Sequence, residues 1–260
     1  MSSSEIRGFA IDMDGTVYKG GLPIPGAREF ISLLKKKGTP FVFLTNNSAK
    51  ARIRYYEKLV SMGFDVSEDD ILTSVTATVR YLNKERRGKK VFLLASPEVE
   101  EEVARSGIAV TDLNPDIVLL TYDRTLTFEK LNRAFHFILG GAELVATHPD
   151  DLCPTEDSYD IDIGPFIRLF ESLANVKANV VGKPNRRMLE MAASVMGLPV
   201  ENVAMVGDRL YTDMKMAADA GTPSILVLSG EARREDLAGS DVRPTYVVDS
   251  VADIPSVIDL

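Results

Sequence analysis

Short apolar runs alternate along the chain with stretches in which apolar residues recur every three or four positions. Runs of four or five apolar residues are typical of strands buried in a parallel sheet, whereas the 3.6-residue period is typical of amphipathic helices. The predicted strands occupy residues 8–12, 40–44, 90–94, 117–120, 144–146, 178–181, 203–206, 224–228 and 246–248. Helical spacing lies between them, for example at residues 30–34, 53–60, 131–138 and 189–196. The alternation predicts βαβ units, and therefore an α/β fold built on a parallel sheet.

Four of these predicted strands end in a polar cluster. The clusters are Asp-Met-Asp-Gly-Thr at residues 12–16, Thr-Asn-Asn-Ser at residues 45–48, Gly-Lys-Pro-Asn at residues 182–185 and Gly-Asp-Arg at residues 207–209. In an open parallel sheet, ligands bind beyond the carboxyl ends of the strands, so residues that are far apart in sequence can meet in one pocket. Each cluster alone is also explained by ordinary loop chemistry after a strand, but four clusters with complementary chemistry favour a shared site.

Two carboxylates, Asp12 and Asp14, mark the first of these strand ends. If the strand ends at Asp12, Asp14 lies on the first loop residues, and both carboxylates can approach a single point. Two carboxylates that close repel each other unless a cation lies between them or one of them binds a proton. A turn with solvated acids is the simpler alternative, since Asp-Gly is a common turn dipeptide.

The other clusters supply groups that a phosphoryl site requires. Asp12 and Asp208 offer oxygen ligands without a histidine or cysteine cluster, which is typical of a site for a hard cation such as Mg²⁺. Lys183 offers a compact positive charge for an anion, and Thr45 with the amides around Asn46 offers neutral donors. A phosphoryl group fits this set of charges and donors.

The acid pair also predicts a reaction. Asp12 can attack phosphorus in line, and Asp14 can protonate the leaving alkoxide and later activate water against the aspartyl-phosphate. Structural roles are the alternatives for the remaining residues: a solvated surface lysine for Lys183, a strand-end cap for Thr45, and helix-capping acids for Asp208 and Asp213. Thr212 is predicted to cap the helix that follows residues 207–209.

The middle of the chain has an α/β alternation of its own, which is too much structure for a loop. We therefore predict two domains. Residues 1–75 and 179–260 form a core domain, and residues 76–178 form a second α/β domain inserted into it.

In their order, spacing and strand-end placement, the four clusters resemble the haloacid dehalogenase (HAD) superfamily of phosphotransferases. The chain more closely resembles the NagD-type branch, the sugar and p-nitrophenyl phosphatases with a class IIA cap. Segments typical of that branch are residues 21–26, 41–48, 147–150 and 207–213. The resemblance covers nearly the whole chain.

The resemblance implies a Rossmann-like parallel-sheet core carrying an inserted α/β cap, and a Mg²⁺-dependent hydrolase. It implies the following roles: Asp12 as nucleophile and Asp14 as acid and base; Asp12, Asp14 (through its carbonyl) and Asp208 as Mg²⁺ ligands supported by Asp213; and Thr45, Asn46 and Lys183 as phosphate ligands. The presence of Asp14 favours phosphoester hydrolysis over dehalogenation, which needs no acid for the leaving group. Relatives often pair through the cap, so a homodimer is expected.

Composition narrows the choice of partner and compartment. The 260 residues are 45% hydrophobic and 26% charged, as in ordinary globular proteins. The net charge of −8 is spread along the chain, so we expect neither nucleic acid nor a membrane as partner. The single cysteine, Cys153, cannot form an internal disulfide, and the N-terminus lacks the features of a signal peptide. We therefore expect a cytoplasmic protein whose partner is a small phosphorylated metabolite.

The sequence says less about which residues of the predicted cap determine substrate specificity. Residues 146–165 can present a loop over the pocket, and they carry His148, Asp150, Cys153, Asp157 and Asp162. Packing within the cap is the simplest role for His148 and Cys153. Sugar phosphates, nucleotides and glycolate phosphate stay open as substrates.

The sequence therefore predicts a Mg²⁺-dependent phosphatase that acts on small phosphomonoesters, such as sugar phosphates or p-nitrophenyl phosphate, through an aspartyl-phosphate on Asp12. The main alternative is a catalytically silent protein that binds or senses phosphometabolites on the same scaffold. A phosphorelay receiver would have about half this length, and a phosphomutase on this scaffold would need a cap that excludes water.

Overall fold

The computed structural model describes residues 5–155 and 158–259, so Asp157 of the predicted cap loop lies outside the described residues. The chain divides into two compact units. We call residues 1–45, 55–72 and 183–260 the core unit, and residues 46–54 and 73–182 the insert unit. The predicted domain limits, at residues 75/76 and 178/179, stay a prediction; the compact units differ from them mainly in grouping residues 46–54 with the insert unit.

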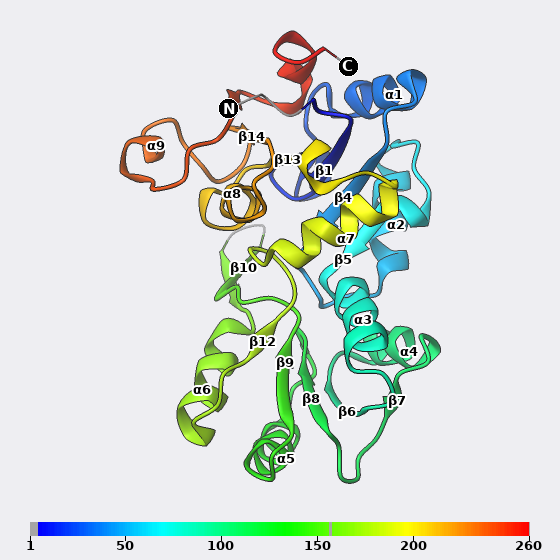
Figure 1. Cartoon of the computed structure of the whole chain (residues 1–260), viewed down its shortest axis with the longest axis vertical. Helices are drawn as coiled ribbons and strands as arrows, with labels where there is room; N and C mark the ends of the chain where they lie inside the picture. Colours follow the sequence, from blue (N-terminus) through cyan, green and yellow to red (C-terminus); the bar gives the residue numbers. More distant parts are fainter. Residues whose placement is uncertain (1–4, 156–157, 260) are drawn as a thin grey trace. The chain divides into compact units, whose positions relative to one another are not determined.

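The core unit is built on a six-stranded sheet with the order β15-β14-β13-β1-β4-β5 (Figure 1). Its strands are β1 (Gly8–Asp12), β4 (Phe41–Thr45), β5 (Ile71–Thr73), β13 (Val203–Gly207), β14 (Ser224–Val227) and β15 (Tyr246–Val248). β1 pairs in parallel with β4 on one side and with β13 on the other. The strand order therefore reverses at β1, and such a switch point is where open α/β sheets bind ligands.

The helices of the core unit are α1 (Ala27–Lys37), α2 (Arg52–Ser61), α7 (Arg186–Met196), α8 (Lys215–Ala220) and α9 (Asp236–Gly239), although the first three residues of α2 are grouped with the insert unit. Every residue of β1, β4 and β13 is buried, which explains why these strands are apolar without alternation. The rings of Phe9 on β1 and Phe30 on α1 meet edge to face, with centroids 5.8 Å apart. The helix α7 contacts β1 and β4. The described part of the core unit also contains a short hairpin, β2 (Tyr18–Lys19) and β3 (Leu22–Pro23), and the short helical segments η1 (Glu68–Asp70), η2 (Val200–Asn202), η3 (Leu210–Met214) and η4 (Val251–Ser256).

The insert unit has its own five-stranded parallel sheet, with the order β12-β9-β8-β6-β7. Its strands are β6 (Lys90–Leu94), β7 (Ala109–Val110), β8 (Ile117–Leu120), β9 (Glu143–Ala146) and β12 (Asn179–Val180), and its helices are α3 (Ser74–Glu85), α4 (Pro97–Arg105), α5 (Phe128–Leu139) and α6 (Gly164–Ala174). A separate antiparallel hairpin joins β10 (Leu152–Pro154) to β11 (Tyr159–Ile161). The predicted α/β class is thus confirmed by two parallel sheets with helices between their strands.

One predicted strand belongs to a different sheet from the one expected. Residues 178–181 were predicted to open the second half of the core, but β12 pairs with β9, where Val180 lies beside Ala146. Asn179 also donates a hydrogen bond to the Tyr81 hydroxyl, 2.6 Å away in the insert unit. An apolar run of this kind fits either sheet, because the pattern alone carries no information about its partner strand.

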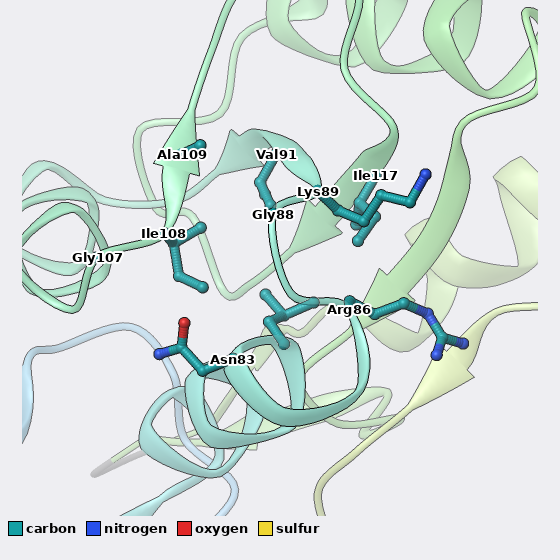
Figure 2. A pocket seen from close by; sticks show the side chains of 10 residues that line it. Asn83, Arg86, Gly88, Lys89, Val91, Gly107, Ile108, Ala109 and Ile117 are labelled. Carbon is teal, nitrogen blue, oxygen red and sulfur yellow. The ribbon is translucent and has the colours of Figure 1, made fainter.

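A cavity of about 50 Å³ lies inside the insert unit, lined by residues of α3 and of β6 to β8 (Figure 2). Its two cationic side chains point away from it and are paired: Arg86 with Glu143 at 2.7 Å and Lys89 with Asp116 at 3.1 Å. A space of this size holds a few water molecules and no metabolite. Within the described residues, no helix is both long and apolar enough to cross a bilayer.

Candidate active site

Three aspartates of the core unit meet at the carboxyl end of its sheet. Asp12 ends β1, and Asp208 directly follows β13, the parallel neighbour of β1. Asp213 lies in η3, five residues further along. All three are buried, and each offers a carboxylate oxygen within 4.8 Å of the others. The predicted meeting of Asp12 and Asp208 is therefore present in the fold, and Asp213 joins them.

Lys183 is the positive charge among these carboxylates. Its ammonium group donates hydrogen bonds to Asp12 Oδ1 and to Asp213 Oδ1, the second at 2.7 Å. Burial opposes the charge, but the Asp12 and Asp213 carboxylates outweigh it and raise the pKa of Lys183 above its usual range. Lys183 is therefore no solvated surface lysine, since only 4% of it is exposed.

The close approach of Asp213 depends on Gly207. A Cβ atom at Gly207 would lie 2.4 Å from the Asp213 carboxyl carbon, so a larger residue would displace that side chain. The second Asp213 oxygen accepts a hydrogen bond from the Arg209 amide at 3.2 Å. The η3 segment is a single π-helical turn, a form often found at functional sites, and it runs directly into α8. The prediction that Thr212 caps a helix is wrong, because Thr212 lies inside this turn and its buried hydroxyl has no partner among the described residues.

Asp208 carries the clearest sign of a missing ligand. Its Oδ2 accepts a hydrogen bond from the Glu231 amide at 2.7 Å, whereas its buried Oδ1 has no partner among the described residues. Burial, reinforced by the negative charges of Asp12 and Asp213, raises the pKa of Asp208 to about 8. Asp12, Asp208, Asp213 and Lys183 have a net charge of −2 when all four are ionised. The Arg209 guanidinium nearby is itself paired with Glu231, so it does not remove this excess.

This excess fits a divalent cation. The donor set consists of carboxylate oxygens, one of them without a hydrogen bond, and includes neither sulfur nor imidazole. Hard oxygen donors of this kind suit Mg²⁺, which binds proteins through a few carboxylates and keeps several waters. The residues present therefore fit the predicted metal.

Asp14 lies in the turn that follows β1. Gly15 has a φ of 84°, in the left-handed region that glycine tolerates, and its amide donates to the Tyr18 carbonyl at 2.7 Å. Asp14 is an exposed residue, but the protein around its carboxyl group displaces part of the water there and raises its pKa; the Lys58 ammonium opposes this rise and the Asp12 carboxylate adds to it. A carboxyl group with a raised pKa is better suited to donating a proton near neutral pH.

The predicted phosphate ligands Thr45 and Asn46 lie on different units. Thr45 is the last residue of β4 and follows Leu44, which lies beside Asp12 in the sheet. Asn46 is grouped with the insert unit, where its side-chain amide donates to both carboxylate oxygens of Asp150 at 3.2 Å. The fold thus places Thr45 at the carboxyl end of β4, beside the end of β1 that carries Asp12.

The candidate cap residues His148 and Asp162 form a buried network inside the insert unit. His148 Nε2 lies 2.9 Å from Asp162 Oδ1, and Nδ1 lies 3.0 Å from the Thr147 hydroxyl. Both ring nitrogens are therefore engaged with protein groups, which supports the predicted packing role of His148.

The strand-end cluster at residues 207–209 includes Arg209, but the sequence indicated no role for it and did not single out the segment after β14. Arg209 Nε lies 2.9 Å from Glu231 Oε2; burial opposes its charge, but Asp12 and other acidic groups raise its pKa above the usual range. Ser229, Gly230 and Glu231 directly follow the predicted strand at residues 224–228. Their position at the end of a parallel strand is the signal that could have identified them.

Removal of the Lys183 charge is expected to destabilise the metal-free protein. Lys183→Met leaves the Asp12 and Asp213 carboxylates buried without their counterion, a change that costs about 3–5 kcal/mol in comparable buried pairs. For a chain of this size, Tm should fall by roughly 10 °C in EDTA at pH 7. Lys215→Met is the matched control, because Lys215 pairs with Asp219 on the exposed face of α8 at 2.8 Å and should have little effect. Equal shifts in the two variants, measured by circular dichroism, would contradict the buried role of Lys183.

Comparison with known proteins identifies the family. A family model described as haloacid dehalogenase-like hydrolase matches residues 9–109, and a second, HAD-hydrolase-like model matches residues 180–254. The sugar-phosphatase AraL of Bacillus subtilis is 35% identical over 250 residues, which cover 95% of this chain and 91% of AraL.

Solved structures give the same result. The 4-nitrophenylphosphatase of Thermotoga maritima has a TM-score of 0.92 and 38% identity, over 96% of this chain and 97% of that one. NagD of Escherichia coli K-12 has a TM-score of 0.90 and 30% identity, over 96% and 98% of the two chains. The protein therefore belongs to the haloacid dehalogenase-like hydrolase family, as an enzyme of the NagD-type phosphatases.

Proposed function

We propose that the protein is a Mg²⁺-dependent phosphatase that hydrolyses small phosphomonoesters through an aspartyl-phosphate on Asp12. The observation that carries the proposal is the buried cluster of Asp12, Asp208 and Asp213 around Lys183, in which Asp208 Oδ1 lacks a partner among the described residues. Such a cluster is poorly suited to a purely structural role, because each buried carboxylate without full compensation opposes folding.

The proposed metal ligands are the Asp12 and Asp208 carboxylates and the Asp14 backbone carbonyl, with Asp213 supporting the site. When bound, Mg²⁺ would offset the charge of the phosphoryl group and of the carboxylates around it. Lys183 supplies a further positive charge, and we propose that its ammonium group turns from the carboxylates to a phosphate oxygen when the ester binds. Thr45 and Asn46 are the proposed neutral donors to the phosphate.

The reaction then has two displacements at phosphorus. An Asp12 oxygen attacks, the bond from phosphorus to the ester oxygen breaks, and Asp14 gives its proton to the departing alkoxide. In the second step Asp14 takes a proton from water, which attacks the same phosphorus and releases phosphate, so that the Asp12 carboxylate is restored. The raised pKa of Asp14 supports the first of these roles.

The relatives guide the choice of substrate. One is named a sugar-phosphatase and another a 4-nitrophenylphosphatase, so sugar phosphates and p-nitrophenyl phosphate are the esters that we propose first. The natural partner is then a small phosphorylated metabolite. A homodimer, a cytoplasmic location and the absence of nucleic-acid and membrane partners stay predictions.

The test is phosphate release from p-nitrophenyl phosphate and from a panel of sugar phosphates and nucleotides, measured with Mg²⁺ and again with EDTA. We expect turnover that requires Mg²⁺ and returns when excess Mg²⁺ is added back. A folded, Mg²⁺-loaded protein that hydrolyses no ester of the panel would contradict the proposal and favour the phosphometabolite-sensing alternative.

A further inference from the structure

Residues 229–231, which we call the Ser229–Glu231 loop, leave β14 and lie directly against the carboxylate cluster. The Ser229 hydroxyl donates a hydrogen bond to the Gly15 carbonyl at 2.8 Å. The Glu231 amide donates to Asp208 Oδ2 at 2.7 Å, and the Ala232 amide that follows donates to the Asp208 carbonyl at 3.0 Å. The loop is thus bonded both to the turn after β1 and to the residue that follows β13.

Gly230 is the point of closest approach. A Cβ atom built there would lie 1.9 Å from Asp208 Oδ2 and 2.4 Å from the Asp208 carboxyl carbon. The backbone of Gly230 does not lie in the left-handed region, so an alanine is opposed there by lack of space alone. Gly15 faces the same oxygen, since its Cβ atom would lie 2.4 Å from it, but its φ of 84° already favours glycine.

These contacts leave the Asp208 carboxylate in one position. Glycine backbone lies against it on two sides, and one oxygen is engaged by an amide, so only Oδ1 stays available. A Mg²⁺ ion demands near-octahedral geometry with oxygens at about 2.1 Å, so its affinity depends on how accurately each carboxylate is placed. Groups that orient a metal ligand without touching the metal typically change metal affinity by about 10–100-fold when they are removed.

We propose that the Ser229–Glu231 loop is a positioning element of the metal site, with Gly230 setting the place of the Asp208 carboxylate. This inference rests on the proposed Mg²⁺ site at Asp12 and Asp208. The substitution Gly230→Ala moves the carboxylate away from the loop, because a Cβ atom cannot share its space. We expect Mg²⁺ affinity to fall at least tenfold while the fold and the affinity for the ester change little.

The test measures metal binding directly on the full chain. Metal-free protein is titrated with Mn²⁺, whose unbound fraction is followed by its electron paramagnetic resonance signal, and Mg²⁺ is then measured by competition. Gly239→Ala is the matched control, because a Cβ atom at Gly239 meets nothing within 4 Å and its backbone is not left-handed. Ser229→Ala removes only the hydroxyl that anchors the loop to Gly15, and it should weaken Mn²⁺ binding several-fold.

Each outcome is decisive. The inference is supported if Gly230→Ala melts within a few degrees of wild type and binds Mn²⁺ at least tenfold more weakly. The variant should also need correspondingly more Mg²⁺ for half-maximal hydrolysis, and its KM for the ester at saturating metal should be unchanged. It is overturned if the folded variant binds Mn²⁺ as wild type does, or if wild type binds none. If Gly230→Ala does not fold, wild-type affinity in Ser229→Ala overturns it. A third outcome separates the two proposals. If Gly230→Ala weakens Mn²⁺ binding but wild type hydrolyses no ester, the proposed function is refuted and the positioning role of the loop stands.

Discussion

Asp12→Asn is expected to abolish hydrolysis of p-nitrophenyl phosphate while the protein stays folded. The carboxamide cannot attack phosphorus, and loss of the covalent nucleophile lowers kcat by roughly 10⁶-fold in a serine protease. The fold should tolerate the change, because Lys183 keeps its hydrogen bond to Asp213 and the buried cluster loses one of its excess negative charges.

The measurement combines phosphate release with a search for the intermediate. Wild-type protein that is quenched in acid during turnover should carry a phosphoryl group on the peptide that contains Asp12, and the variant should carry none. Asp219→Asn is the control, because Asp219 lies on the exposed face of α8, where both of its carboxylate oxygens accept hydrogen bonds from Lys215. Turnover of Asp12→Asn within tenfold of wild type would assign the nucleophile to another residue.

The second large effect is expected from Asp208→Asn, which should remove the activation by Mg²⁺ and lower turnover by roughly 10³-fold. The substitution keeps an oxygen that can accept from the Glu231 amide but removes the negative charge from the oxygen without a partner. Metal-ion catalysis of this type contributes several kcal/mol to transition-state stabilisation, and each 1.36 kcal/mol is tenfold in rate.

The same variant should be more stable than wild type when no metal is present at pH 8. The folded-state pKa of Asp208 is raised to about 8, against an ordinary value of 3.8, mainly by burial. A group whose pKa rises on folding stabilises the protein below its unfolded pKa, and this contribution is lost as pH rises through the folded value. The contribution of Asp208 to the stability of metal-free wild type is therefore lost between about pH 4 and pH 8, whereas the asparagine variant has no such loss at this position.

Melting curves at pH 5 and pH 8, with EDTA or with Mg²⁺, test the sign of this effect. In EDTA the advantage of Asp208→Asn should grow from pH 5 to pH 8, and each kcal/mol corresponds to roughly 2–4 °C in a chain of this size. With Mg²⁺ the order should reverse, because only wild type binds the ion and gains stability from it. A variant that is less stable than wild type in EDTA at pH 8 would mean that the Asp208 carboxylate is compensated without a metal.

The sequence predicted the parts of this fold that depend on local patterns. The strands β1, β4 and β13 could be recognised as apolar runs because they are buried throughout. Asp12 and Asp208 meet because the neighbouring parallel strands β1 and β13 end at the same edge of the sheet. The partner of β12 could not be predicted, because its pairing with β9 depends on a contact across more than 30 residues that leaves no pattern in the chain.

The contacts of Gly230 could not be predicted from the sequence either. A glycine after a strand suggests a turn, whereas here the absence of a side chain makes room for a carboxylate that is 22 residues away in sequence. Thr212 shows a different case, in which a residue with high capping propensity lies inside a π-helical turn, and the next residue of that turn, Asp213, bonds to Lys183.

The excess of negative charge among Asp12, Asp208, Asp213 and Lys183 also has a kinetic consequence. In the proposed mechanism, an ester that reaches the metal-free cluster meets more negative than positive charge, so encounter is favourable only after the cation has bound. Binding is then ordered, with metal first and ester second, and inorganic phosphate inhibits as a product only of the metal-loaded enzyme. If the proposed mechanism holds, the supply of free Mg²⁺ would determine what fraction of the enzyme can enter the catalytic cycle.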